Sequence, residues 1–150
     1  MKSKYVTDKQ FDKLSNGKNI KSYPNPYVKE VNGIQYNIVP SSEKFEVRIL
    51  SEQEKLWWCA SETEEEVVLL SISEIGWFPT ELVAGTLSKN LGRGVTRENF
   101  DMNTELSKKT GWLKNTGSLG SRGNLFLKSK VNEAINILNK NGFGFKKIEF

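Results

Sequence analysis

Histidine is absent from this chain of 150 residues, and its absence restricts the function more than most residues that are present. Without imidazole, the chain lacks the usual general base of hydrolases, the group that activates serine and cysteine nucleophiles, and the commonest zinc ligand. Aspartate is also scarce, since only Asp8, Asp12 and Asp101 occur, and no carboxylate pattern typical of a metal nuclease stands out. The sequence therefore predicts a protein that is not an enzyme and needs no metal or cofactor.

Cysteine and long apolar runs are equally scarce. A single cysteine, Cys59, cannot form an internal disulfide or a thiolate metal site by itself, which agrees with a reducing compartment and a core-filling role. No apolar run approaches the roughly 20 residues of a membrane-spanning helix, and the first ten residues lack the apolar centre of a signal peptide. We therefore expect a cytoplasmic protein without a membrane partner.

The sequence is rich in charge, which is unevenly distributed. Residues 1–40 carry a net charge of +4, residues 41–85 carry −7, and residues 86–150 carry +7. This separation indicates partners of both signs rather than solubility alone. Eighteen lysines and fourteen asparagines are typical of an AT-rich genome, such as that of a low-GC bacterium or its phage.

Local signals predict a helix and a hairpin near the start of the chain. Thr7 opens a T-x-x-Q capping box, which predicts a helix at about residues 8–15. The pair Asn32-Gly33 separates two runs rich in Val, Ile and Tyr, so we expect a hairpin with strands at about residues 27–31 and 34–39.

Two further strands are predicted in the middle of the chain. KFEVRIL alternates apolar and charged residues with the period of a half-buried strand, and LWWCA is predicted to be its antiparallel neighbour. On such a strand Trp57 and Trp58 would face opposite sides. The capping box S-E-T-E at Ser61 then predicts a helix that includes Val67 to Leu70, although a strand at about residues 66–72 is an alternative.

Boundaries in the second half are clearer. Pro79 and Thr80 begin a helix that Gly92 ends, VTRENF forms one helical turn, and a short helix follows at about residues 103–110. WLKNT and NLFLK then pair as strands around the glycine-rich turn GSLGSRG, Ser129 caps a last helix, and FGFKKIEF is an edge strand. The apolar stripe of the last helix consists of Val131, Ala134, Ile135 and Leu138.

The predicted fold is therefore α+β. An antiparallel N-terminal β-sheet with a helix occupies residues 1–75, and a winged-helix-like helical half with a basic Gly-rich hairpin occupies residues 76–150. A single compact domain is the alternative.

Residues 106–130 contain six basic residues, four glycines and no acid, so an anionic partner would stabilise this run. The order of short helices, basic hairpin and final helix is that of a winged-helix module, in which the helix before the hairpin lies in the major groove. The nucleic-acid-binding residues predicted on this basis are Arg93, Arg97, Lys108, Lys109, Trp112, Lys114, Arg122, Lys128 and Lys130. Neutral phosphate donors would be Asn115, Thr116, Ser118 and Ser121.

Structural explanations compete with this interpretation. A basic, glycine-rich hairpin can be a solvated surface turn, and Trp112, directly after a helix end, is more often a core residue than a base-stacking one. The glycines of GSLGSRG fit no nucleotide-binding loop. We expect a nucleic-acid-binding regulator or adaptor that prefers DNA to RNA and is a monomer or homodimer.

A second hypothesis is a phage or mobile-element inhibitor, of the anti-CRISPR type, that binds a host nucleic-acid enzyme. The acidic middle of the chain would occupy a nucleic-acid channel on that enzyme. The residues predicted for this protein partner are Trp57, Trp58, Glu62, Glu64, Glu65 and Glu66.

Overall fold

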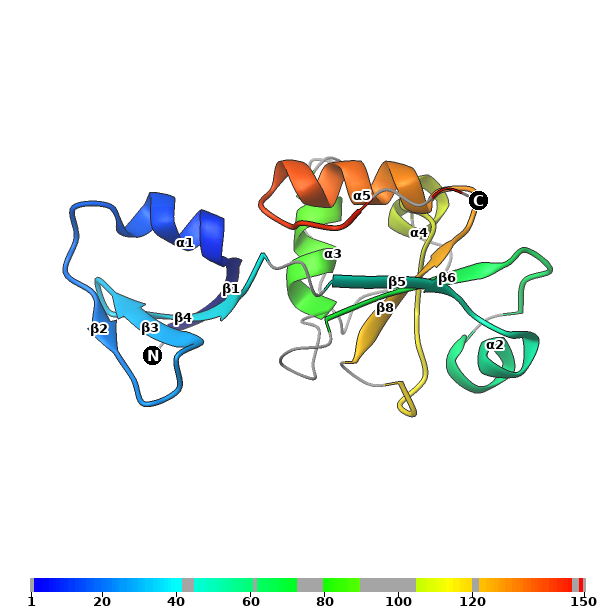
Figure 1. Cartoon of the computed structure of the whole chain (residues 1–150), viewed down its shortest axis with the longest axis horizontal. Coiled ribbons are helices and arrows are strands. Elements are labelled where there is room, and N and C mark those ends of the chain that lie inside the picture. The colour runs from blue at the N-terminus through cyan, green and yellow to red at the C-terminus, as the bar shows by residue number, and fades with distance from the viewer. Residues whose placement is uncertain are drawn as a thin grey trace.

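The computed structural model of this chain has two parts, each built on a four-stranded sheet (Figure 1). The described residues are 2–41, 45–60, 62–72, 80–89, 105–119, 122–146 and 149. The first part contains β1 to β4 and α1, and the second part contains the other described strands and helices. The predicted α+β class is confirmed.

The first sheet has the order β1-β4-β3-β2, with strands at Lys2–Thr7, Lys21–Ser22, Val28–Val31 and Ile34–Val39 for β1, β2, β3 and β4 respectively. The predicted hairpin is confirmed, because β3 and β4 pair antiparallel around Asn32 and Gly33, whose φ angles are 52° and 78°. β1 pairs parallel with β4, however, so the prediction of an antiparallel N-terminal sheet is wrong for this strand. Its β-forming residues, Tyr5, Val6 and Thr7, occupy only the three positions directly before α1, and its pairing with β4 is non-local.

Helix α1 (Asp8–Ser15) covers the first sheet and has the predicted bounds. The capping box is present: the Gln10 amide donates to the Thr7 hydroxyl at 3.1 Å, and the Thr7 amide donates to the Gln10 side chain at 3.0 Å. Phe11 packs edge-on against Tyr36, with ring centroids 5.7 Å apart, and buries the apolar face of the helix.

The second sheet is antiparallel, in the order β5-β6-β8-β7, with β5 at Phe45–Ile49, β6 at Val67–Ile72, β7 at Trp112–Leu113 and β8 at Gly123–Leu127. It joins strands from both sides of residues 75 and 76, so a division at that point would cut the sheet. The two sheets separate instead between Val39 and Phe45.

Strand β6 replaces the helix predicted after Ser61 and agrees with the alternative strand. Val68 and Leu70 lie in the larger core on one face of the sheet, whereas Val67 and Leu69 lie in a smaller core on the other face. A strand buried on both faces reads as a continuous apolar run, which hides its period of two.

Helix α2 (Glu52–Trp58) replaces the predicted strand LWWCA. The sequence S-E-Q-E forms a capping box, in which the Glu54 amide donates to the Ser51 hydroxyl at 3.2 Å and the Ser51 amide donates to the Glu54 carboxylate at 3.0 Å. This cap and the helix formers that follow it outweigh the β propensity of the two tryptophans.

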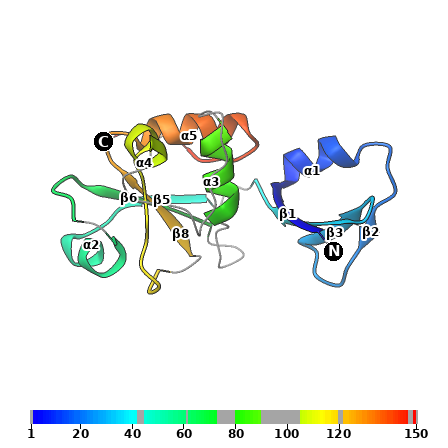
Figure 2. The same cartoon turned by 180° about the vertical axis from the view of Figure 1, so that it is seen from behind.

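Helices α3 (Thr80–Ser88), α4 (Glu105–Thr110) and α5 (Val131–Lys140) lie on the same side of the second sheet (Figures 1 and 2). The stripe predicted on α5 is confirmed, because all four of its residues are buried. Gly111 ends α4 with a φ of 71°, as the sequence predicts. The predicted end of the preceding helix at Gly92 and the turn VTRENF lie outside the described residues.

The end of the chain differs from prediction in two respects. Lys130, not Ser129, is the N-cap of α5, and it makes no side-chain cap bond. Residues 143–146 form no strand; instead the Phe145 amide donates to Asn139 of α5 at 3.0 Å. Phe143 and Phe145 pack on Phe45, with ring centroids 6.0 and 4.4 Å away. Core packing of these rings therefore takes the place of an edge strand.

Polar contacts join the two parts close to the end of α5. The Gln10 side-chain nitrogen donates to the Asn141 carbonyl at 2.7 Å, and the Ser41 hydroxyl donates to the Gly142 carbonyl. Gly142 has a φ of 102° and lies against Thr7, so a Cβ at this position would overlap the Thr7 hydroxyl.

Candidate nucleic-acid interface

The last turn of α4 carries two exposed basic side chains, Lys108 and Lys109. Lys130 lies beside them, because its ammonium group donates to the Lys108 carbonyl at 2.5 Å. A Cβ on Gly111 would lie 2.8 Å from the Lys130 Cβ, so the chain after α4 passes closely over the start of α5. The structure thus brings three of the predicted basic residues together, and we call Lys108, Lys109 and Lys130 the α4 cluster.

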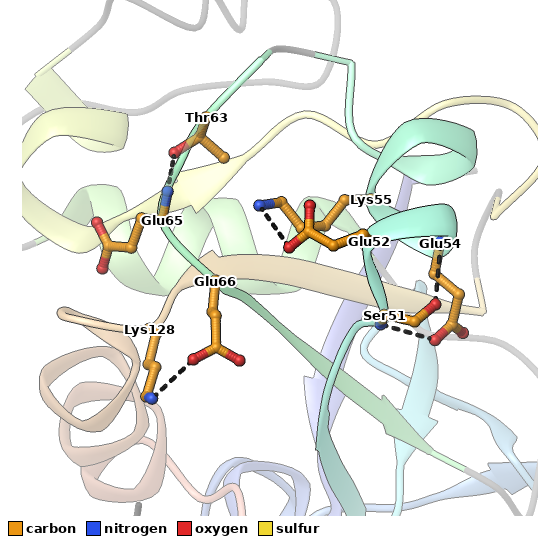
Figure 3. A network of polar contacts seen from close by, with 8 residues as sticks. All are labelled: Ser51, Glu52, Glu54, Lys55, Thr63, Glu65, Glu66 and Lys128. Atoms are coloured by element: carbon orange, nitrogen blue, oxygen red, sulfur yellow. Dashed lines mark hydrogen bonds and ion pairs between the residues drawn. The ribbon is translucent and has the colours of Figure 1, made fainter.

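Lys128, which the sequence also predicts in this interface, is paired with an acid. Its ammonium group lies 3.0 Å from the Glu66 carboxylate, and the Ser129 amide donates to the Glu65 carboxylate at 2.6 Å. Figure 3 shows Glu65 and Glu66 on the segment that leads into β6, with Lys128 directed at Glu66. The acidic and basic segments of the sequence therefore meet here, and part of the charge separation is neutralised locally.

Residues 114–119, which follow β7, lie at the opposite end of the second sheet from α4 (Figures 1 and 2). Lys114, directly after β7, and Arg122, directly before β8, are exposed. Asn115 donates to the Gly123 carbonyl at 3.1 Å, and Thr116 donates to the Trp57 carbonyl at 2.8 Å. Two of the predicted phosphate donors thus make hydrogen bonds within the protein. Ser118 is exposed, and Ser121, like Arg93 and Arg97, lies outside the described residues.

Trp112 belongs to the core. It is 2% exposed, and its indole nitrogen donates to the Asn124 side-chain oxygen at 3.0 Å. No ring face is open to a base, so the structure favours the core role over the predicted role in nucleic-acid binding. The Asn124 side-chain nitrogen is buried and has no hydrogen-bond partner among the described residues.

The predicted protein-partner residues lie on and after α2. Trp57 is 57% exposed beside Leu56, which is 76% exposed, whereas Trp58 is half-buried beneath Arg48, whose guanidinium lies 5.7 Å from its ring centroid. Glu62, Glu64 and Glu66 are exposed and Glu65 is half-buried. The predicted placement of the two tryptophans on opposite faces of a strand is wrong, because both lie on helix α2.

An ion pair fixes α2 to the end of β5. The Arg48 guanidinium makes two hydrogen bonds to the Glu54 carboxylate, at 2.8 and 2.5 Å. These bonds, together with the Ser51 amide, lower the pKa of Glu54 from its ordinary 4.5 to about 2, and the same bonds raise the pKa of Arg48. Lys55 is buried and lies 3.5 Å from Glu52 (Figure 3).

Sequence reasoning missed a second group of basic residues, which lies between the two parts of the molecule. Its members are Lys4, Lys9, Lys13, Lys89 and Lys140. They come from β1, α1 and the ends of α3 and α5. No local motif could have found them, because only the tertiary structure brings these elements together.

Neither a membrane-spanning helix nor a metal-binding group occurs in the described part of the chain. None of its helices is long and apolar enough to cross a membrane, and no three His, Cys, Asp or Glu side chains are placed to hold a metal ion. No protein-family model, curated protein or solved structure matches this chain.

Proposed function

We propose that this protein is a small, non-enzymatic nucleic-acid-binding regulator or adaptor that contacts DNA through the α4 cluster and the β7–β8 hairpin. The observation that carries this proposal is the exposure of Lys108 and Lys109 on the short helix directly before the hairpin. Neither side chain forms an ion pair with a described residue, so both charges are available to phosphates.

The strand order supports a winged-helix-like arrangement of the second part. Along the chain β6 is followed by α3, α4, β7 and β8, and in space β8 lies between β6 and β7. In winged-helix modules the helix before the hairpin contacts the major groove, and the hairpin reaches an adjacent backbone. Here α4 would take the first position, and Lys114 and Arg122 would take the second.

The proposal is tested by fluorescence-anisotropy titration with duplex DNA, single-stranded DNA and duplex RNA. We expect duplex DNA to bind most tightly, and Lys108→Glu with Lys109→Glu to weaken binding to it. A matched control is Lys18→Glu with Lys146→Glu, which changes the net charge equally at two exposed positions outside the α4 cluster and the hairpin. Equal weakening by both pairs would show a non-specific charge effect and contradict the proposal. Arg122→Glu tests the hairpin separately.

The exposed pair on α2 favours a second candidate function, inhibition of a host nucleic-acid enzyme by a phage or mobile-element protein. Leu56 and Trp57 are large apolar side chains that α2 leaves exposed, close in sequence to the exposed acids Glu62 and Glu64. A partner with a basic, nucleic-acid-binding channel would complement both features. Under this proposal Leu56→Ala with Trp57→Ala abolishes inhibition of the enzyme and leaves DNA affinity unchanged. Retained inhibition in that variant would exclude α2 as the contact.

A further inference from the structure

Two adjoining cavities open between the first and the second part of the molecule. One has a volume of about 470 Å³ and is lined by residues of β1, α1 and α3, and by Asn141. The other has a volume of about 610 Å³ and is lined by residues of α1, the end of α5 and Lys89. They share Gln10, Lys89 and Asn141 and therefore adjoin; we call the two cavities together the interpart groove.

The interpart groove carries a concentrated positive charge. Among the described residues, five exposed lysines line it, namely Lys4, Lys9, Lys13, Lys89 and Lys140, against a single carboxylate, that of Asp12. Lys89 and Lys140 lie at the C-terminal ends of α3 and α5, where each helix dipole contributes about half a negative charge. About three positive charges remain after these offsets. A groove of this sign raises the local concentration of anions.

The other side chains of the groove suit a nucleotide strand. Tyr5, on β1, lines the groove and is 38% exposed, so part of its surface is open to a base. Each cavity has the volume of a small-ligand site rather than of a duplex. Two such cavities side by side favour a single strand over a lone nucleotide, because successive phosphates would meet lysines along the whole groove.

The groove is formed by both parts of the molecule. Lys4, Lys9 and Lys13 come from the first part, whereas Lys89 and Lys140 come from the second. The hydrogen bond from Gln10 to the Asn141 carbonyl joins the two sides, and both residues line both cavities. A bound strand would therefore contact both parts and hold them in a fixed arrangement.

We propose that the interpart groove binds single-stranded nucleic acid, with its phosphates against the lysines and a base against Tyr5. This site is separate from the α4 cluster and adds a single-strand function to the proposed duplex-binding one. Its sequence preference is weak, because lysines read phosphates and an aromatic ring stacks on any base.

The test measures binding of a labelled thymidine oligonucleotide of about 12 nucleotides by fluorescence anisotropy at several salt concentrations. The groove variant combines Lys4→Gln, Lys89→Gln and Lys140→Gln, and glutamine avoids placing acids at helix C-termini. We expect at least a tenfold loss of affinity, and a decrease of about 2 in the slope of log affinity against log salt, for three lost phosphate contacts. Unchanged affinity and slope would overturn the proposal.

A matched variant with Lys108→Gln, Lys109→Gln and Arg122→Gln separates the two sites. If it loses duplex binding and retains the oligonucleotide, both proposals stand. If this variant loses oligonucleotide binding and the groove variant does not, the groove is excluded as the single-strand site, while the proposed function survives. A third outcome is that the wild type binds the oligonucleotide but not duplex DNA, and that only the groove variant loses oligonucleotide binding. In that case the groove proposal stands and the proposed function fails.

Two controls address folding and the size of the ligand. Circular dichroism and thermal unfolding establish that each variant is folded, and Tyr5→Leu provides a second, uncharged change that should lower oligonucleotide affinity several-fold. ATP serves as a competitor. If ATP displaces the oligonucleotide at an equal concentration of nucleotide units, the site takes mononucleotides and the single-strand proposal is wrong.

Discussion

Gln10 and Asn141 are 131 positions apart in the sequence and form a hydrogen bond between the two parts of the molecule, 2.7 Å from the Gln10 side-chain nitrogen to the Asn141 carbonyl. The side-chain oxygen of Gln10 accepts a hydrogen bond from the Thr7 amide and completes the capping box of α1. One side chain therefore couples the start of a helix to the packing of the two sheets.

Replacement of Gln10 by Glu tests this coupling. A glutamate keeps the oxygen that caps α1 but loses the donor to Asn141, and places a carboxylate near that carbonyl. We expect the free energy of unfolding to fall by about 1–2 kcal/mol. Chemical denaturation measures the change. Gln53→Glu, at an exposed position of α2, is the control and should have little effect; an equal loss in both variants would contradict the coupling.

Gly142 and Gly85 form a second matched pair. Alanine at position 142 must adopt a φ near 102° and would overlap Thr7, so we expect a destabilisation of about 1–3 kcal/mol. Alanine at position 85 lies in α3 with no atom near its Cβ, so we expect a stabilisation of about 0.5–1 kcal/mol. Thermal unfolding gives both values. A neutral Gly142→Ala would mean that the two parts are not packed as described.

Trp112 distinguishes a core role from a base-stacking role. Trp112→Phe leaves the buried Asn124 oxygen without its indole donor, so we expect a loss of about 1–3 kcal/mol of stability. Nucleic-acid affinity, measured on the folded protein, should not change. Trp57→Phe, at an exposed site, is the control for stability. Loss of nucleic-acid affinity in the folded Trp112→Phe protein would restore the stacking hypothesis.

The Arg48–Glu54 pair predicts a dependence of stability on pH. The pKa of Glu54 is about 2 in the folded protein and near 4.5 without the pair. At pH values above 4.5 the carboxylate is charged in both states and the pair stabilises the fold; as the pH falls toward 2 this contribution is lost, because the unfolded state binds the proton first. The stability difference between wild type and Glu54→Gln should therefore be constant near neutral pH and shrink below 4.5. A difference independent of pH down to 2 would contradict the pairing.

The elements that the sequence predicted well have signals confined to a few residues. The Thr7 capping box placed α1, Asn32 and Gly33 placed the first hairpin, and Gly111 marked the end of α4. Each signal fixes the local backbone geometry directly, so these elements depend little on tertiary contacts.

The missed elements depend on distant partners or on competing signals. β1 is a strand because β4 pairs with it, and β6 reads as helix or strand because both of its faces are buried. In α2 the capping residues Ser51 and Glu54 compete with the β propensity of the tryptophans, and the cap prevails. The interpart groove could not be predicted at all, since its lysines come from elements separated by most of the chain.

The measurement that tests the proposed function most directly is the salt dependence of duplex DNA binding by the wild type and by the Lys108→Glu, Lys109→Glu variant. We predict that the wild type binds at low salt, and that the variant binds more weakly, with a slope of log affinity against log salt smaller by about 2. Absence of binding by the wild type at low salt, or identical slopes for the two proteins, would contradict a nucleic-acid interface at α4.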